Sequence, residues 1–205
     1  KIFFKLENKT IIEHIINKCK KFSEKIIIIS NNFNKTEIKN ILKKKKIKNI
    51  KIVLQKRPIG MGHAVLLGLE KVKTQSAAVL WSDQIYLTED TIKKTIKKFK
   101  KNNSFFTFPI FYKKDPYVKI FLNKKKKFLN IVQTREINKK FRFGYTDCGF
   151  FIFNKNFVKK NLIKLIKKKL VITKKTNEVD FLKSFYYFNK IEKIDLVKAS
   201  SYKDT

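Results

Sequence analysis

The sequence predicts an α/β fold built on a largely parallel sheet. Short apolar or β-branched runs at 25–30, 51–54 and 77–81 alternate with segments whose apolar residues recur at helical spacing. Continuous apolar runs are typical of parallel strands covered on both faces. The alternation is typical of parallel strands joined by right-handed crossovers. Gly60 and Gly62 then separate the strand at 51–54 from the next helix.

Length and composition favour one globular domain. The chain has 205 residues, 43% of them hydrophobic, which is enough for a sizeable core. No apolar run approaches the ~18 residues of a membrane span, so we expect no membrane partner. Cys19 and Cys148 have no metal-ligand spacing. Because no signal peptide is visible, the sequence predicts reduced thiols and a cytoplasmic location.

A formal net charge of +34 suggests a polyanionic partner such as nucleic acid. Only Arg57, Arg135 and Arg142 are arginines, however, and the rest of the basic residues are lysines. Lysine accompanies abundant Ile, Asn and Phe, which is the set that A/T-rich codons encode. We therefore favour compositional drift over a nucleic-acid surface, and keep a basic nucleic-acid-binding domain as an alternative.

The first elements follow from capping signals and apolar spacing. Thr10 and Glu13 have capping-box spacing at the start of a helix over 10–22. The isoleucines within 25–30 predict a buried strand. Asn34 has capping spacing ahead of a second helix, which leads into the strand at 51–54.

The later elements alternate less regularly. The sequence predicts helix 88–101, strand 105–111, a hairpin of strands 117–122 and 127–133, strand 147–153, helices 156–169 and 177–188, and strand 191–197. We interpret this half as an antiparallel addition to the same domain.

The segment from Gln55 to Asp83 predicts a phosphate and nucleotide site. Gly60 and Gly62 let backbone N–H groups approach a ligand, and the following helix offers its positive N-terminus to an anion. Asp83 lies just past the strand at 77–81, where α/β sheets bind ligands, and is a hard oxygen ligand suited to Mg²⁺. The alternatives are an ordinary turn for the glycines and a turn residue for Asp83.

The same segment resembles a known family. Gln55–Ala64 has the form Q-x-x-x-x-G-x-G-H-A, and Asp83–Leu87 has the form D-x-x-x-L. These motifs resemble those of the sugar-1-phosphate nucleotidyltransferases, the family of N-acetylglucosamine-1-phosphate uridylyltransferase. The resemblance implies a three-layer, Rossmann-like, glycosyltransferase-A-like fold with a mixed, mostly parallel sheet. It implies nucleotide contacts from Gln55, Gly60, Met61 and Gly62. Met61 replaces the family's Thr or Leu, and Ser82 replaces its Gly.

Three motifs in the second half extend the resemblance. The strand at Tyr117 and Val118 is similar to P-x-x-Y-G-R-I, with Val118 in place of Gly. Gln133 occupies the position of the sugar-binding Glu in I-V-E-x-K-D/E, and Asp147 occupies the Asn position of E-x-N-T-G, which ends here at Gly149. The resemblance implies that these five residues bind the sugar phosphate. Alternatively, Tyr117 packs under the sheet and Gly149 only permits close packing.

The resemblance also bears on both ends of the sequence. Lys1 matches the lysine that closes the family's phosphate loop, although a terminal residue without a role is the alternative. The rest of that loop, and the G-x-N-T that follows the position of Asp204–Thr205 in the family, are not in this sequence. We therefore expect a segment shortened at both ends of the active site. It would still be a single domain, with a nucleotide-binding half at 1–111 and a sugar-phosphate-binding half at 112–205.

The predicted reaction joins an NTP and a sugar-1-phosphate to give an NDP-sugar and pyrophosphate. Asp83 would hold Mg²⁺, and Lys1 would neutralise phosphate charge as a second catalytic residue. Residues 1–205 alone are expected to show no appreciable nucleotidyl transfer. The substitutions at Ser82, Val118 and Gln133 leave a second alternative, an inactive regulatory homologue. The base, the sugar and the oligomeric state do not follow from the sequence.

Overall fold

The structure is a computed structural model that describes residues 1–201. The expectation for the C-terminal end at Asp204–Thr205 lies outside the described residues. Within residues 1–201, no helix combines the length and the apolar character needed to cross a membrane.

The N-terminal elements follow the predicted order, apart from two unpredicted two-residue strands at the start. They are β1 (Lys5–Leu6), β2 (Lys9–Thr10), α1 (Ile11–Lys20), β3 (Ile26–Ser30), α2 (Asn32–Lys44) and β4 (Ile50–Leu54). The capping box of Thr10 and Glu13 is confirmed. The second cap is one turn earlier than predicted, because the Asn31 side chain accepts a hydrogen bond from the Asn34 N–H at 2.9 Å.

The strands β3 and β4 form a separate two-stranded parallel sheet. The prediction that the isoleucines of 25–30 are buried is only partly correct, since Ile26–Ile29 are all half-buried. The physical reason is that β3 has a hydrogen-bonded neighbour on one side only, and an edge strand lacks the cover of a central one.

The remaining elements build the larger part of the molecule. In order they are α3 (Met61–Leu69), β5 (Ser76–Leu80), α4 (Glu89–Lys101), β6 (Phe106–Lys114), β7 (Val118–Leu122), β8 (Phe128–Gln133), α5 (Thr134–Ile137), β9 (Phe143–Asp147), β10 (Phe150–Asn154), α6 (Lys155–Lys167), α7 (Phe181–Ile191) and β11 (Asp195–Lys198). The predicted hairpin of β7 and β8 is confirmed.

One interrupted strand organises the seven-stranded sheet. Both β9 and β10 run antiparallel to β6, with Ile110 paired to Asp147 and Thr107 paired to Ile152. The register shifts by two between these pairs, so Cys148 and Gly149 form a break where a single strand over 147–153 was expected. On the other side of this strand, β5 pairs with β10 and β7 pairs with β9. The break therefore lies where β5 ends and β7 begins.

The α/β fold class is confirmed, and the sheet is mixed as predicted. The sheet is less parallel than expected, because β9 and β10 run antiparallel beside β5, β6 and β7. Strand β11 pairs parallel with β6, and the β3–β4 pair is also parallel.

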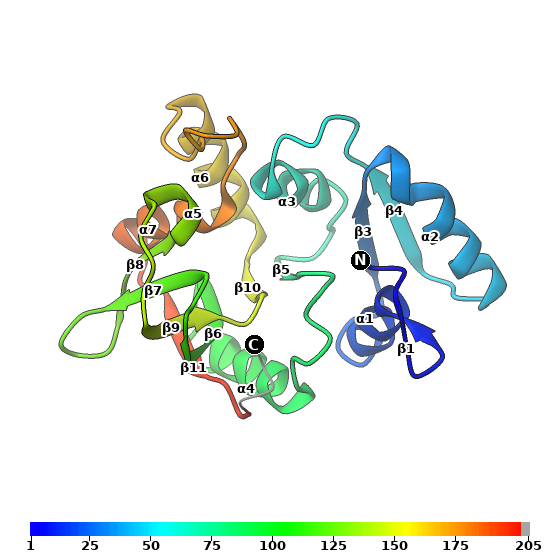
Figure 1. The fold of residues 1–205 in the computed structure, drawn as a ribbon, viewed down its shortest axis with the longest axis horizontal. Coiled ribbons are helices and arrows are strands. Elements are labelled where there is room, and N and C mark those ends of the chain that lie inside the picture. The colour runs from blue at the N-terminus through cyan, green and yellow to red at the C-terminus, as the bar shows by residue number, and fades with distance from the viewer. Residues whose placement is uncertain (202–205) are drawn as a thin grey trace.

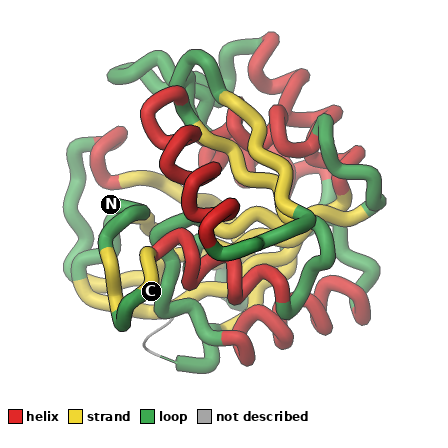
Figure 2. The backbone as a smooth tube through the Cα atoms, turned by 90° about the vertical axis from the view of Figure 1, so that its right-hand side faces the viewer, coloured by secondary structure: helices red, strands yellow, loops and turns green. Residues whose placement is uncertain are grey.

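Helices cover both faces of the large sheet. Phe151 and Phe153 face a cluster that includes α3, α6 and α7, whereas Phe150 and Ile152 face a cluster that includes α4. Figure 1 shows this assembly beside the β3–β4 pair with α1 and α2, and Figure 2 shows helices on both sides of the strands. The result is the predicted three-layer arrangement.

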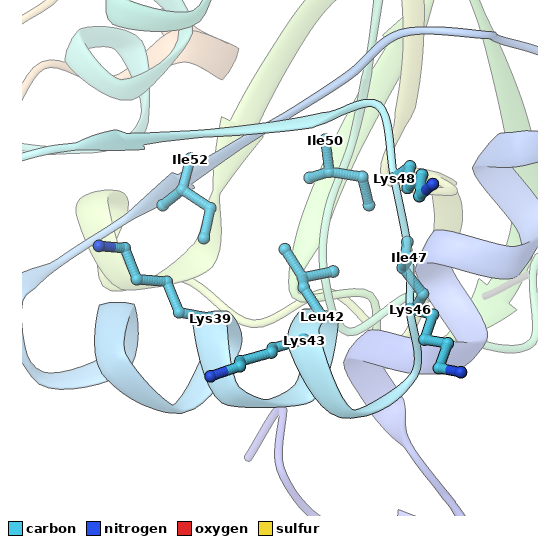
Figure 3. A pocket seen from close by; sticks show the side chains of 8 residues that line it. All are labelled: Lys39, Leu42, Lys43, Lys46, Ile47, Lys48, Ile50 and Ile52. Carbon is cyan, nitrogen blue, oxygen red and sulfur yellow. The ribbon is translucent and has the colours of Figure 1, made fainter.

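Packing is looser around the small sheet. A groove of about 460 Å³ opens between α2 and β4. Leu42, Ile47, Ile50 and Ile52 line it together with lysines, as Figure 3 shows. None of the residues that the sequence predicts for the functional site lines this groove.

Candidate functional site

The glycine loop before α3 is shaped by a segment from the far end of the chain. The N–H of Gly62 donates to the Val179 carbonyl at 2.9 Å, and the N–H of Val179 donates to the Ile59 carbonyl at 2.8 Å. Gly60 has φ +100°, and a Cβ there would lie 2.6 Å from the Val179 oxygen. Only glycine fits this position, and the reason is contact with Val179.

Gln55 supports this loop from inside. Its Nε2 donates to the Gly60 carbonyl at 3.1 Å and lies 3.0 Å from His63 Nδ1. Its backbone N–H donates to the Ser30 carbonyl at 2.7 Å, which ties the loop to β3. Met61 packs against the large hydrophobic core. These side chains hold the loop, and the Gly62 N–H that was expected to face a ligand is occupied by the Val179 carbonyl.

Asp83 lies in the turn that follows β5 and is exposed. Its carbonyl accepts the Ile85 N–H at 3.0 Å, and Gln84 Nε2 lies 3.5 Å from its Oδ1. The turn is fixed from α1, because Lys18 Nζ donates to the Ile85 carbonyl at 2.5 Å. Asp83 is therefore exposed to solvent, while hydrogen bonds fix the backbone of its turn.

The break between β9 and β10 packs directly onto this turn. The Trp81 N–H donates to the Gly149 carbonyl at 2.9 Å, and a Cβ on Gly149 would lie 2.4 Å from Gln84 Cγ. Gly149 therefore has the close-packing role offered above as the alternative. Its own N–H donates to Asp147 Oδ1 at 2.8 Å.

Asp147 and Asp83 lie on the two sides of this contact, because Gly149 bonds to Asp147 and packs against Gln84, the residue after Asp83. Burial raises the pKa of Asp147 to about 6, the Gly149 N–H opposes that shift, and the negative charge of Asp83 adds to it. A nearby like charge disfavours ionisation, which is why Asp83 adds to the effect of burial. Among residues 1–201, no group of three or more His, Cys, Asp and Glu side chains is placed to hold a metal.

The sugar-side residues share one row of the sheet. Val118 is paired with Gln133 across β7 and β8, and Ile120 is paired with Tyr145 across β7 and β9. Because β7 and β9 are antiparallel, the pairing of Ile120 with Tyr145 places Val118 opposite Asp147, two residues further along. Positions opposite each other point to the same face of a sheet. The structure thus aligns three of the residues that the sequence singled out.

Tyr117 lies beside this row at the surface. Its side chain is 53% exposed, so the alternative in which it packs under the sheet is wrong. Its carbonyl accepts the Thr134 N–H at 2.9 Å. Lys1 is also exposed, and no hydrogen bond or ion pair joins its side chain to another described residue.

Sequence reasoning missed Asp180. Gln133 Nε2 donates to Asp180 Oδ2 at 2.8 Å, and both side chains are buried. The sequence prediction placed Asp180 inside a helix over 177–188, but the helix begins at Phe181 with Asp180 as its N-cap. The preference of Asp for N-cap positions was the signal available in the sequence.

The fold and this site define a class of protein, the nucleotide-dependent transferases with an α/β sheet. Residues 1–136 match the family model described as MobA-like NTP transferase domain. The match covers more than half of the chain, and the protein belongs to this family. The resemblance to sugar-1-phosphate nucleotidyltransferases is confirmed.

Individual relatives agree. The chain is 31% identical over 176 residues to "Bifunctional protein GlmU" of Buchnera aphidicola subsp. Schizaphis graminum (strain Sg), covering 83% of this chain and 36% of that protein. The chain thus spans little more than a third of that relative's length.

Solved structures share the fold at low identity. A putative glucose-1-phosphate thymidylyltransferase from Bacillus anthracis, in complex with a sucrose, has a TM-score of 0.79 and 14% identity, covering 98% of this chain and 79% of that one. HddC from Yersinia pseudotuberculosis, complexed with GMP-PN, has a TM-score of 0.69 and 13% identity, covering 98% and 81%.

Proposed function

We propose that the protein transfers a nucleotidyl group from an NTP to a sugar-1-phosphate. A phosphate oxygen of the sugar-1-phosphate forms a bond to the α-phosphorus. The bond from that phosphorus to the bridging oxygen breaks, and pyrophosphate leaves with the electron pair. The products are an NDP-sugar and pyrophosphate. Catalysis of this kind consists mainly of positioning and charge stabilisation.

One observation carries the proposal. Val179 and Asp180 are consecutive residues, and they contact the glycine loop and Gln133 respectively. A nucleotide bound beside the start of α3 would therefore lie close to the row of Val118, Gln133 and Asp147. The N-terminus of a helix favours bound phosphate. Sugar hydroxyls need fixed donors and acceptors, and Gln133 and Asp147 in this row are polar side chains held by hydrogen bonds.

The donor set suits Mg²⁺, the cofactor predicted from the sequence. Asp83 and Asp147 lie on the two sides of the contact between Gly149 and the turn after β5, and Mg²⁺ is commonly bound by one or two carboxylates together with substrate phosphates. When bound, the ion would neutralise phosphate charge. Asp83 is the exposed member of the pair and Asp147 is held by the Gly149 N–H, so Asp83 is the better placed to reach a phosphate-bound ion.

A pyrophosphate-release assay tests this function. Residues 1–205 and the protein expressed from the intact gene are each given Mg²⁺, the four NTPs, and glucose 1-phosphate or N-acetylglucosamine 1-phosphate. We expect one NTP and one sugar phosphate to give turnover, with residues 1–205 the slower preparation. Absence of turnover from both preparations with every pair of substrates, or NTP binding without sugar-1-phosphate binding, would refute the proposal.

Asp83→Asn removes one charge and keeps the size of the side chain. We expect turnover to fall by ~10²–10³, the typical effect of losing one preorganised electrostatic group. Asp115→Asn is the matched control, because Asp115 is also an exposed turn residue and lies before β7. Near-normal turnover of Asp83→Asn would refute the role of Asp83.

The charge of +34 keeps nucleic-acid binding as a second candidate. Calorimetry with NTP and with a short DNA duplex, each at low and at high salt, separates the two candidate functions. Nucleic-acid binding weakens steeply as the salt concentration rises. The cytoplasmic location stays a prediction. Cys19 and Cys148 form no disulfide in the structure. The oligomeric state is open to sedimentation measurements.

A further inference from the structure

The amide of Gln133 is oriented by a carboxylate that comes from another element. Its Nε2 donates to Asp180 Oδ2 at 2.8 Å. An ionised carboxylate only accepts hydrogen bonds, so the amide cannot turn over without setting two oxygens against each other. Asp180 itself is fixed, because its Oδ1 accepts the Lys183 N–H at 3.1 Å as the N-cap of α7.

The other end of the amide is free. Gln133 Oε1 has no hydrogen-bond partner among residues 1–201. In the part of the chain that the structure describes, the side-chain oxygens that are both fully buried and without a hydrogen-bond partner are Thr107 Oγ1 and Glu136 Oε1. Because Gln133 Oε1 has no partner but is not among them, it is not fully buried. The 4% of Gln133 that remains exposed therefore includes Oε1. This oxygen therefore reaches the surface, on a residue that shares a row with Val118 and Asp147.

We propose that Asp180 is a specificity-determining positioning residue: it fixes the Gln133 amide so that the sugar side presents an acceptor. A ligand group bound there must donate a hydrogen bond, as a sugar hydroxyl or an acetamido N–H does. Asp180 acts through Gln133 and does not touch the substrate. This inference rests on the proposed function, since it concerns the sugar-1-phosphate half of that site.

The neighbouring residue gives Asp180 a second connection. Val179 bonds to both Ile59 and Gly62 of the glycine loop. The segment that sets the polarity of the sugar side is therefore the segment that shapes the nucleotide loop. An effect confined to sugar binding would show that Asp180 acts through Gln133, whereas an equal effect on both ligands would show a general disturbance of the segment.

The single variant Asp180→Asn reverses the polarity. Asn is also a favoured N-cap, so its Oδ1 keeps the bond to the Lys183 N–H and its Nδ2 faces Gln133. Gln133 must then turn Oε1 inward and present Nε2, a donor, to the ligand. We expect the KM for the sugar-1-phosphate to rise by ~10–100-fold, with the affinity for NTP and the melting temperature nearly unchanged.

The double variant Asp180→Asn with Gln133→Glu restores the acceptor. The introduced carboxylate accepts a hydrogen bond from the introduced amide on one oxygen and offers its other oxygen to the ligand. We expect the double variant to recover most of the lost sugar-1-phosphate affinity, although each single change weakens binding. Gln133→Glu alone sets two carboxylates at hydrogen-bond distance, which is unfavourable.

The measurements are KM and kcat with glucose 1-phosphate and N-acetylglucosamine 1-phosphate, NTP affinity by calorimetry, and thermal unfolding. Wild-type KM in Asp180→Asn, equal losses for NTP and sugar phosphate, or no recovery in the double variant would each overturn this inference and leave the proposed function standing. A wild-type protein that binds NTP but no sugar-1-phosphate would overturn the proposed function instead, and this inference with it.

Discussion

Two apolar runs in this chain are buried to very different extents. Ile26–Ile29 belong to β3 and are all half-buried, whereas Phe150–Phe153 belong to β10 and are all buried. Both runs predict a strand, and both are strands. Their burial differs because β10 lies between β5 and β6 with helices on both faces, whereas β3 has only β4 beside it.

An apolar run thus predicts local structure better than it predicts cover. A strand's side chains are buried by elements distant in sequence, and β10 receives them from α3, α4, α6 and α7. Beside β4, a groove of about 460 Å³ opens between the strand and α2 instead. Stability in this protein is therefore expected to be concentrated in the larger sheet.

Phe151→Ala should cause the largest loss of stability. Phe151 is fully buried, and its ring centroid lies 5.2 Å from that of Phe185 and 5.4 Å from that of Trp81. Truncation leaves a cavity in a packed aromatic cluster, so we expect the free energy of unfolding to fall by about 3–5 kcal/mol. Urea unfolding measures it.

Ile28→Ala is the counterpart in β3. Because Ile28 is half-buried and can be replaced by water, we expect a loss below about 2 kcal/mol. Equal losses for the two variants would contradict the view that the small sheet is loosely packed.

Two glycines allow a smaller comparison of the same two regions: Gly60 packs against Val179 of the larger part, and Gly68 packs against Ile29 of β3. A Cβ on Gly60 would lie 2.6 Å from the Val179 oxygen, whereas a Cβ on Gly68 would lie 3.5 Å from Ile29 Cδ1. Gly60→Ala should cost about 1–3 kcal/mol, because φ is +100° and the backbone of Val179 cannot give way. It should also weaken NTP binding by moving the loop.

Gly68→Ala should stabilise the protein by about 0.5–1 kcal/mol, because Gly68 lies within α3 and faces ordinary contact distances. Thermal unfolding and NTP calorimetry on both variants check the pair. A stabilising Gly60→Ala with unchanged NTP affinity would contradict the assigned contact with Val179.

Much of the fold could be predicted from local pattern. The capping box of Thr10 and Glu13 and the hairpin of β7 and β8 are decided by neighbouring residues, and both are confirmed. The antiparallel insertion of β10 beside β5 could not be predicted, because it depends on pairing between residues about 70 positions apart.

The site divides in the same way. Gly60, Gly62 and Asp83 stand out in the sequence because glycines and an acid follow apolar runs. The tasks of Gln55 and Gly149 as packing and support residues depend on tertiary contacts and became visible only in the structure. Asp180 was missed because its partner Gln133 lies 47 residues away and its helix was expected to start earlier.

The smallest expected effect is a pH dependence of the free energy of unfolding. It is predicted for one buried carboxyl group from each region, Glu13 in α1 and Asp180 at the start of α7. Burial alone would raise the pKa of Glu13, but hydrogen bonds from Thr10 and the charge of Lys45 outweigh it and hold the pKa below its ordinary value of 4.5. At Asp180, burial prevails over the bonds from Lys183 and Gln133, nearby Glu136 adds to it, and the pKa is raised above 3.8. The two groups should therefore affect stability with opposite sign.

Because the folded pKa of Glu13 is lowered, its contribution is present above pH 4.5 and is lost as the pH falls through the folded value. Because the folded pKa of Asp180 is raised, its contribution to stability is complete below pH 3.8 and is lost as the pH rises through the folded value.

Urea unfolding of wild type, Glu13→Gln and Asp180→Asn between about pH 3 and pH 7 tests both signs, with differences in the free energy of unfolding below about 1 kcal/mol. The advantage of wild type over Glu13→Gln should grow with pH, and its advantage over Asp180→Asn should shrink. Two differences of the same sign would show that one of these carboxyl groups is not held as the structure describes, and the hydrogen bonds from Thr10 or from Gln133 would be the contacts to re-examine.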